Sequence, residues 1–85
     1  MVTKEIPAHL RWACRRGMLE LDVLLGNFLQ EQYLNLSTKE QTIFVQLLSS
    51  EDQSLYWWLT GSSTAPVPEW AALIEMIRHH AKNRH

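Results

Sequence analysis

The sequence predicts an all-α protein, a compact five-helix bundle, and three observations support this class. Apolar residues recur at the i, i+3, i+4 spacing of a helix in several successive segments. No segment of useful length alternates polar and apolar residues as a strand does, and no repeat of about 20 to 50 residues is present. The 85 residues are expected to form one domain, in which short helices and brief loops favour an up-and-down arrangement.

The first two predicted helices lie on either side of a glycine. Residues 1–7 are expected to be a flexible arm that ends at Pro7, a residue suited to the first turn of a helix. A helix over about residues 8–16 follows, and Gly17 stands where a helix end favours φ > 0. The second helix, over about residues 18–33, carries the strongest apolar stripe, made of Leu21, Leu24, Leu25, Phe28 and Leu29.

Three further helices complete the prediction. Ser37 and Glu40 have the S-x-x-E spacing of a capping box, which begins a third helix that reaches about residue 49. Asp52 is expected to cap a short fourth helix that Gly61 closes, and Pro68 begins the fifth helix after a loop over residues 62–67. Residues 79–85, "HHAKNRH", are expected to be a frayed basic tail.

Charge and composition exclude several classes of protein. Eight basic and nine acidic residues leave a net charge of −1, so no global field recruits nucleic acid or anionic lipid. No apolar run approaches the roughly 20 residues that span a bilayer, and "MVTKEIPAHL" lacks the apolar core of a signal peptide. A single cysteine, Cys14, fits a reducing compartment. A soluble, cytoplasmic protein is therefore expected. The chain is also expected to be a monomer, although its composition does not decide this.

The sequence offers little for a catalytic thiol or a metal site. Cys14 shares the apolar face of Leu10, and His9 lies well around the helix from it, so Cys14 is expected in the core. Side chains of the adjacent His79 and His80 point about 100° apart on a helix. With no partner that completes a tetrahedral set, neither these histidines nor His85 is expected to form a metal site.

Carboxylates, glycines and tryptophans also have structural explanations. Glu20 and Asp22 diverge by about 200° on a helix, so they cannot flank one substrate atom. The three glycines are scattered and form no phosphate-binding loop. Of the adjacent Trp57 and Trp58, Trp58 shares a face with Leu55 and is expected in the core. No catalytic, cofactor-binding or metal-binding residue is therefore expected.

The stretch around Gly17 is the candidate site. If Leu10 and Cys14 point inward, Trp12 and Arg16 lie on the solvent side of the first helix with Arg15 beside them. Arg16 is then exposed, and Arg16→Ala is expected to change stability by no more than ~0.5 kcal/mol. A solvated charged face explains this strip about as well as a binding patch does. The arginines and tryptophan, and charge of both signs, favour a protein partner over nucleic acid.

A family resemblance decides between these alternatives. Residues 15–22, "RRGMLELD", resemble the R-R-G-M-x-E-L-D signature of the succinate dehydrogenase assembly factor family. The run "IFVQLLSSEDQSLYWWL" resembles the family's F-x-x-L-L-x-x-x-D-x-x-L-x-x-W-L pattern, with Asp52, Leu55 and Trp58 at its spacing. The similarity covers about residues 8–61.

The resemblance implies a five-helix assembly factor that binds the flavoprotein subunit of succinate dehydrogenase. It implies that this factor promotes covalent attachment of FAD to a histidine of that subunit. The factor itself is expected to supply no catalytic side chain. FAD is not expected to bind stably to the chain itself. Fumarate reductase flavoprotein is a second possible client, and an antitoxin role in a toxin–antitoxin pair is the alternative. The expected partner-binding residues are Arg16, Gly17 and Glu20, together with Trp12, Arg15, Met18 and Asp22.

Overall fold

A computed structural model of the protein describes residues 5–84, which contain five α-helices and no β-strand. A single 3-10 turn, η1, follows the second helix. The elements are α1 (Ala8–Ala13), α2 (Leu19–Gln32), η1 (Tyr33–Asn35), α3 (Thr38–Leu48), α4 (Asp52–Thr60) and α5 (Pro68–Lys82). The all-α class and the five helices are as the sequence predicts.

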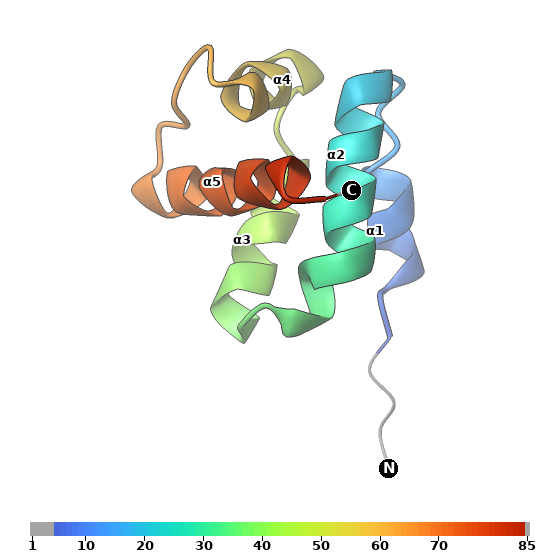
Figure 1. Ribbon diagram of the computed structural model, residues 1–85. Coiled ribbons are helices and arrows are strands. Elements are labelled where there is room, and N and C mark those ends of the chain that lie inside the picture. The colour runs from blue at the N-terminus through green and yellow to red at the C-terminus, as the bar shows by residue number, and fades with distance from the viewer. Residues whose placement is uncertain (1–4, 85) are drawn as a thin grey trace.

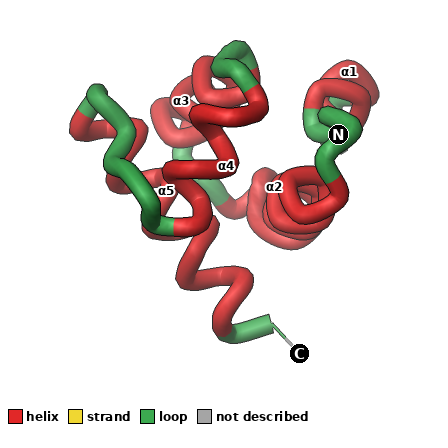
Figure 2. The backbone as a smooth tube through the Cα atoms, turned by 90° about the horizontal axis from the view of Figure 1, so that it is seen from above, coloured by secondary structure: helices red, strands yellow, loops and turns green. Residues whose placement is uncertain are grey.

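The helices do not form a simple up-and-down bundle. Helices α1 and α2 run antiparallel, and α3 rises beside them after the turn at η1 (Figure 1). Helix α5 then crosses α2 and α3 and also packs on α4 (Figure 1). Seen from above, α1 and α2 lie to one side of α3, α4 and α5 (Figure 2). The up-and-down expectation was wrong because contacts between distant helices, rather than loop length, set the direction of α5.

Local signals fix several helix ends. The Ser37 hydroxyl accepts a hydrogen bond from the Glu40 backbone N–H at 3.1 Å, and the Glu40 carboxylate accepts one from the Ser37 N–H at 2.9 Å. This reciprocal capping box begins α3 as predicted. Gly61 closes α4 at φ 85°, and Pro68 occupies the first turn of α5.

The core lies where α5 meets the inner faces of the other helices. Phe28 of α2 and Phe44 of α3 pack with ring centroids 5.8 Å apart, and Tyr33 lies 5.9 Å from Phe44. Trp58, which was expected in the core, is only half-buried against it and packs on Trp70 with ring centroids 6.1 Å apart, while Trp57 is exposed. Helix α5 contributes the buried residues Leu73, Ile74 and Ile77.

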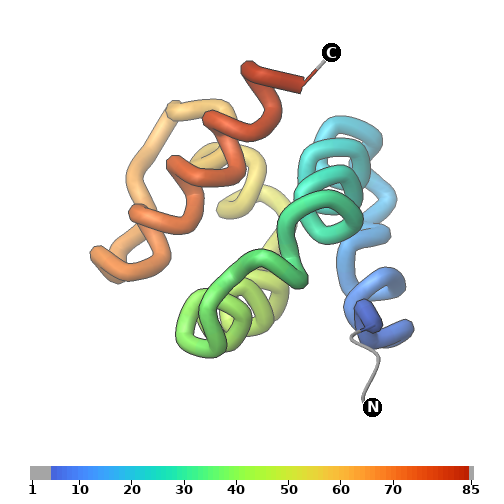
Figure 3. The backbone as a smooth tube through the Cα atoms, turned by 60° about the horizontal axis from the view of Figure 1, so that its bottom comes forward, coloured from blue at the N-terminus to red at the C-terminus, as the bar shows by residue number. Residues whose placement is uncertain are grey.

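Both ends of the described chain are more ordered than the sequence indicated. Ile6, placed in a flexible arm over residues 1–7, is buried in the core. Helix α5 continues to Lys82, and His80 and Arg84 both bond to Glu31 of α2, so residues 79–84 are not a frayed tail. Figure 3 shows this end of α5 running toward α2. The expectations for residues 1–4 and 85 fall outside the described residues.

Candidate functional site

The candidate site is the connection between α1 and α2. Helix α1 ends at Ala13, three residues earlier than predicted, and Cys14 is its C-cap. Gly17 therefore does not close α1; it lies just before α2, where its φ of +84° confirms the predicted left-handed conformation. A Cβ added at Gly17 would meet no atom within 4 Å. Glycine is therefore favoured here by the left-handed backbone conformation and not by close packing, and the surface above it is open.

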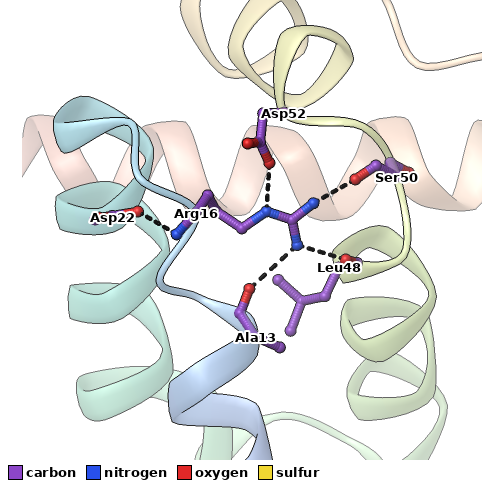
Figure 4. A network of polar contacts seen from close by, with 6 residues as sticks. All are labelled: Ala13, Arg16, Asp22, Leu48, Ser50 and Asp52. Atoms are coloured by element: carbon purple, nitrogen blue, oxygen red, sulfur yellow. Dashed lines mark hydrogen bonds and ion pairs between the residues drawn. The ribbon is translucent and has the colours of Figure 1, made fainter.

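Arg16 does not point to solvent. Its guanidinium reaches across to the connection between α3 and α4 (Figure 4). Only 15% of the side chain is exposed. Arg16 Nε donates to Asp52 Oδ1 at 2.6 Å, and Nη1 donates to the Leu48 carbonyl at 2.6 Å. Nη1 also donates to the Ala13 carbonyl at 3.1 Å, and Nη2 donates to the Ser50 carbonyl.

These contacts join three helix ends. Ala13 and Leu48 are the last residues of α1 and α3, and their carbonyls lack partners within their own helices. A cation suits the negative end of a helix dipole, and the carboxylate of Asp52 suits the first turn of α4. Asp52 was predicted to be the cap of α4, but Glu51 holds that position and Asp52 binds Arg16 instead.

The expectation of an exposed Arg16 was therefore wrong. It came from a helical pattern extended to residue 16, whereas the helix ends at Ala13 and the chain then turns. Beyond the helix end, the angle between Trp12 and Arg16 no longer follows the helical repeat. The partners of Arg16 lie up to 36 residues away in the sequence, at positions that no local pattern relates to it.

Asp22 and Met18 support the same connection from α2. Asp22 Oδ1 accepts a hydrogen bond from the Arg16 backbone N–H at 2.6 Å (Figure 4). The Asp22 N–H in turn donates to the Met18 carbonyl at 2.9 Å. Met18 is the N-cap residue of α2 and packs, half-buried, against the core. The two residues hold the backbone on either side of Gly17.

The outward side of this connection is a surface of mixed chemistry, which we call the turn surface: Trp12, Arg15, Gly17, Leu19 and Glu20. Trp12 is 72% exposed and Leu19 is 78% exposed, both unusual for large apolar side chains. The Arg15 guanidinium lies 5.8 Å from the centre of the Trp12 ring, within the range of a cation–π contact. Glu20 is also exposed, and it stands in the first turn of α2.

Leu19 and the neighbouring Val23 are the residues that sequence reasoning missed. Val23 is 49% exposed and lies one turn after Leu19, so both occupy one side of α2. The sequence did contain a signal for them. Leu19 and Val23 each lie two positions from Leu21 of the apolar stripe, which places them about 200° around the helix from it. Branched apolar residues at those positions mark a second, outward apolar strip.

The cysteine and the metal-ligating side chains are the other candidates for chemistry. Cys14 is buried, as expected, and this burial raises the pKa of its thiol to about 11, which disfavours the thiolate needed for nucleophilic chemistry. Within residues 5–84, no group of three or more histidine, cysteine, aspartate or glutamate side chains is arranged to hold a metal ion. No helix among those residues is long and apolar enough to cross a membrane.

Known proteins resemble the chain over nearly its whole length. Residues 8–81 match the Sdh5 family, described as flavinator of succinate dehydrogenase. The chain belongs to this family. The match extends from the start of α1 almost to the end of α5, so it includes every element that shapes the turn surface.

Relatives of the chain in several bacteria carry the name FAD assembly factor SdhE. The Shewanella oneidensis protein is 45% identical over 74 residues, which cover 87% of this chain and 90% of that protein. The Photobacterium profundum protein is 40% identical over 84 residues, 99% of this chain and 96% of that protein. The Coxiella burnetii protein is 46% identical over 69 residues, 81% of this chain and 84% of that protein.

Proposed function

We propose that this chain is an assembly factor that binds the flavoprotein subunit of succinate dehydrogenase and promotes covalent attachment of FAD to that subunit. Membership of the flavinator family carries this proposal, together with relatives named FAD assembly factor that align over almost their full length. The same findings favour assembly over the antitoxin alternative. The proposal includes fumarate reductase flavoprotein as a second client.

The turn surface is the proposed docking site. It combines two exposed apolar side chains, Trp12 and Leu19, with a cation at Arg15 and a carboxylate at Glu20. Exposed tryptophan and arginine are frequent anchors of protein interfaces. Gly17 leaves space for close approach between them, because nothing lies within 4 Å of the place where its Cβ would stand.

Arg16 takes a different role from the one expected of it. With its guanidinium bonded to Asp52 and to three carbonyls, Arg16 has little donor capacity left for a partner. We assign it to positioning: it holds the connection in the shape that presents Gly17 and Trp12. Asp22 and Met18 assist from the other side of Gly17.

The factor is proposed to act by ordering its client rather than by supplying acid, base or nucleophile. The bond-forming chemistry belongs to the flavin and to the client side chain that it joins. Holding these two groups in a productive geometry lowers the entropic part of the barrier. On this proposal the chain acts as a monomer in the cytoplasm and does not retain FAD by itself.

The function is tested by mixing the purified chain with apo-flavoprotein subunit and FAD. Flavin that survives denaturing electrophoresis is then measured by its fluorescence. The expected result is a faster rise of fluorescence in the subunit band than in a mixture without the chain. Equal rates with and without the chain, together with no binding between chain and subunit, contradict the proposal.

Matched variants locate the docking site. Trp12→Ala and Glu20→Gln are expected to weaken binding to the subunit, because both residues lie on the turn surface. Trp57→Ala and Glu69→Gln are the controls: Trp57 is exposed on α4, and Glu69 occupies the first turn of α5 as Glu20 does that of α2. Equal losses in both sets place the docking site elsewhere.

Cys14→Ser tests whether a thiol takes part. A buried thiol with a raised pKa is expected to be dispensable, so the variant should keep its flavinylation activity while losing some stability. Thermal unfolding and the fluorescence assay on the same preparation separate the two effects. A folded variant without activity establishes a role for the thiol.

A further inference from the structure

A groove of about 390 Å³ lies between α1 and α2, next to the turn surface. Arg11 and Arg15 line it from α1 and from the residues that follow that helix. Val23, Gly26 and Gln30 line it from α2. Arg15 belongs to both the groove and the turn surface, so the two are continuous.

Gly26 is an unusual residue for its position in the groove. It stands in the middle of α2, where glycine is less favourable than alanine. Its backbone does not adopt positive φ, and a Cβ added there would meet no atom within 4 Å. Neither the backbone nor the packing of the described chain therefore requires glycine at this position, and its effect is to open the groove down to the helix backbone.

The two arginines at the groove differ from the other arginines of the described chain in their partners. Arg16, Arg78 and Arg84 each pair with a carboxylate, whereas among residues 5–84 no carboxylate pairs with Arg11 or Arg15. Both of these arginines are exposed at the groove. One carboxylate also lines the groove, that of Asp22, which accepts the Arg16 backbone N–H through Oδ1 and keeps its negative charge, so two cations face one anion. The groove therefore has positive charge available on one side.

We propose that this groove binds a segment of the client flavoprotein subunit that carries a carboxylate beside small apolar side chains. This inference rests on the proposed function and extends the docking site beyond the turn surface. A guanidinium donates paired hydrogen bonds to a carboxylate, which matches Arg11 and Arg15. Val23 offers apolar contact, and the space over Gly26 admits the backbone of the segment.

A protein segment fits this groove better than a free nucleotide does. The groove is continuous with a surface whose largest exposed side chains, Trp12 and Leu19, are apolar, so one protein partner covers both. Its cations are two arginine side chains, and no glycine-rich loop cradles a phosphate. Binding of free FAD through its phosphates is the alternative that the experiment must separate.

The experiment measures affinity for apo-flavoprotein subunit, without FAD, beside thermal unfolding of each variant. Gly26→Ala is expected to raise the thermal midpoint by about 2–8 °C, yet to raise Kd for the subunit about fivefold or more because its methyl group would stand where the backbone of the bound segment approaches α2. Arg11→Gln is expected to leave the midpoint nearly unchanged and raise Kd about three- to tenfold, with a smaller difference at high salt. Lys39→Gln, which removes an exposed charge on α3, is the matched control and should change neither.

The outcomes separate this inference from the proposed function. If the wild-type chain does not bind the subunit, the proposed function itself fails. If the wild type binds and Gly26→Ala and Arg11→Gln bind equally well, the groove inference is wrong while the function stands. If the two variants lose affinity for free FAD and keep affinity for the subunit, the groove binds phosphate and the inference is overturned. A Gly26→Ala variant that is more stable but binds more weakly supports it directly.

Discussion

Two regions of this small domain use an arginine and a carboxylate to join distant segments, with very different surroundings. At the α1–α2 connection, Arg16 pairs with Asp52, 36 residues away, and its side chain is 15% exposed. At the end of α5, Arg84 donates from Nε to both oxygens of Glu31 at 3.0 Å, and its side chain is 42% exposed. Glu31 also contacts His80 at 2.8 Å.

The difference shows that the surroundings of an ion pair determine how much it contributes to the stability of the fold. Water can replace Arg84 at Glu31 with little change in free energy, as at most surface pairs. Around Arg16, the acceptors include carbonyls at the ends of α1 and α3, and removing the guanidinium leaves them without a partner in a half-buried place. We therefore expect the contacts of Arg16 to stabilise the whole fold. The contact between Arg84 and Glu31 is expected to stabilise only the packing of the end of α5 on α2.

Arg16→Ala is expected to have the largest effect. It should lower the free energy of unfolding by about 2–4 kcal/mol, because several charge-assisted hydrogen bonds are lost and Asp52 keeps an unpaired charge. Urea denaturation measures the change, with Arg84→Ala as the exposed counterpart. A loss no greater than that of Arg84→Ala would show that the two regions do not differ.

Arg16→Lys sharpens the comparison by keeping the charge. An ammonium cannot reach Asp52 and the carbonyls of Leu48 and Ser50 at once, so the free energy of unfolding should fall by about 1–2 kcal/mol. The same denaturation experiment measures this, and Arg84→Lys serves as control. Full stability in Arg16→Lys would mean that charge alone, without the fork of donors, holds the connection.

Gly17→Ala tests the backbone beside Arg16. Because φ is +84° and the added Cβ meets nothing, the cost should be that of the left-handed conformation, about 1–2 kcal/mol. Gly17→Arg should cost a similar amount in stability but abolish binding to the flavoprotein subunit, since its side chain would cover the turn surface. Denaturation and binding assays on both variants separate strain from obstruction; equal binding by the two would remove Gly17 from the docking site.

The contact at Glu31 should have the smallest effect, and it should depend on pH. Hydrogen bonding from Arg84, followed by its charge and the contact with His80, holds the pKa of the Glu31 carboxyl below its usual range. A lowered pKa in the folded state means that the stabilisation is present at neutral pH and is lost as the pH falls through that pKa. The thermal midpoint of Glu31→Gln should therefore approach that of the wild type in acid; a constant difference would contradict this.

Much of the fold was predictable because its signals are local. The capping box at Ser37, the end of α4 at Gly61 and the proline that begins α5 depend on a few neighbouring residues, and all three predictions are confirmed. The direction of α5 was not predictable, because it depends on which apolar faces meet. The helical repeat places side chains only while the helix lasts, and α1 ends before Arg16.

The candidate site was likewise predictable only in part. Gly17, Glu20, Trp12 and Arg15 lie on the outward side as the sequence indicated, whereas Arg16 lies inward. A local pattern could show that a charged, aromatic strip exists. It could not show that one of two adjacent arginines would find acceptors at the end of α3 and in the turn before α4.

The position of α5 has a consequence for the synthesis of this protein. Helix α5 packs on α2, α3 and α4 and supplies Leu73, Ile74 and Ile77 to the core, yet it is translated after all of them. A nascent chain that has emerged only as far as α4 leaves the apolar faces of three helices uncovered. The connection held by Arg16 needs α3 and α4 in place, and these need α5. We therefore expect the turn surface to take its final shape only after α5 has been synthesised and has packed on the other helices.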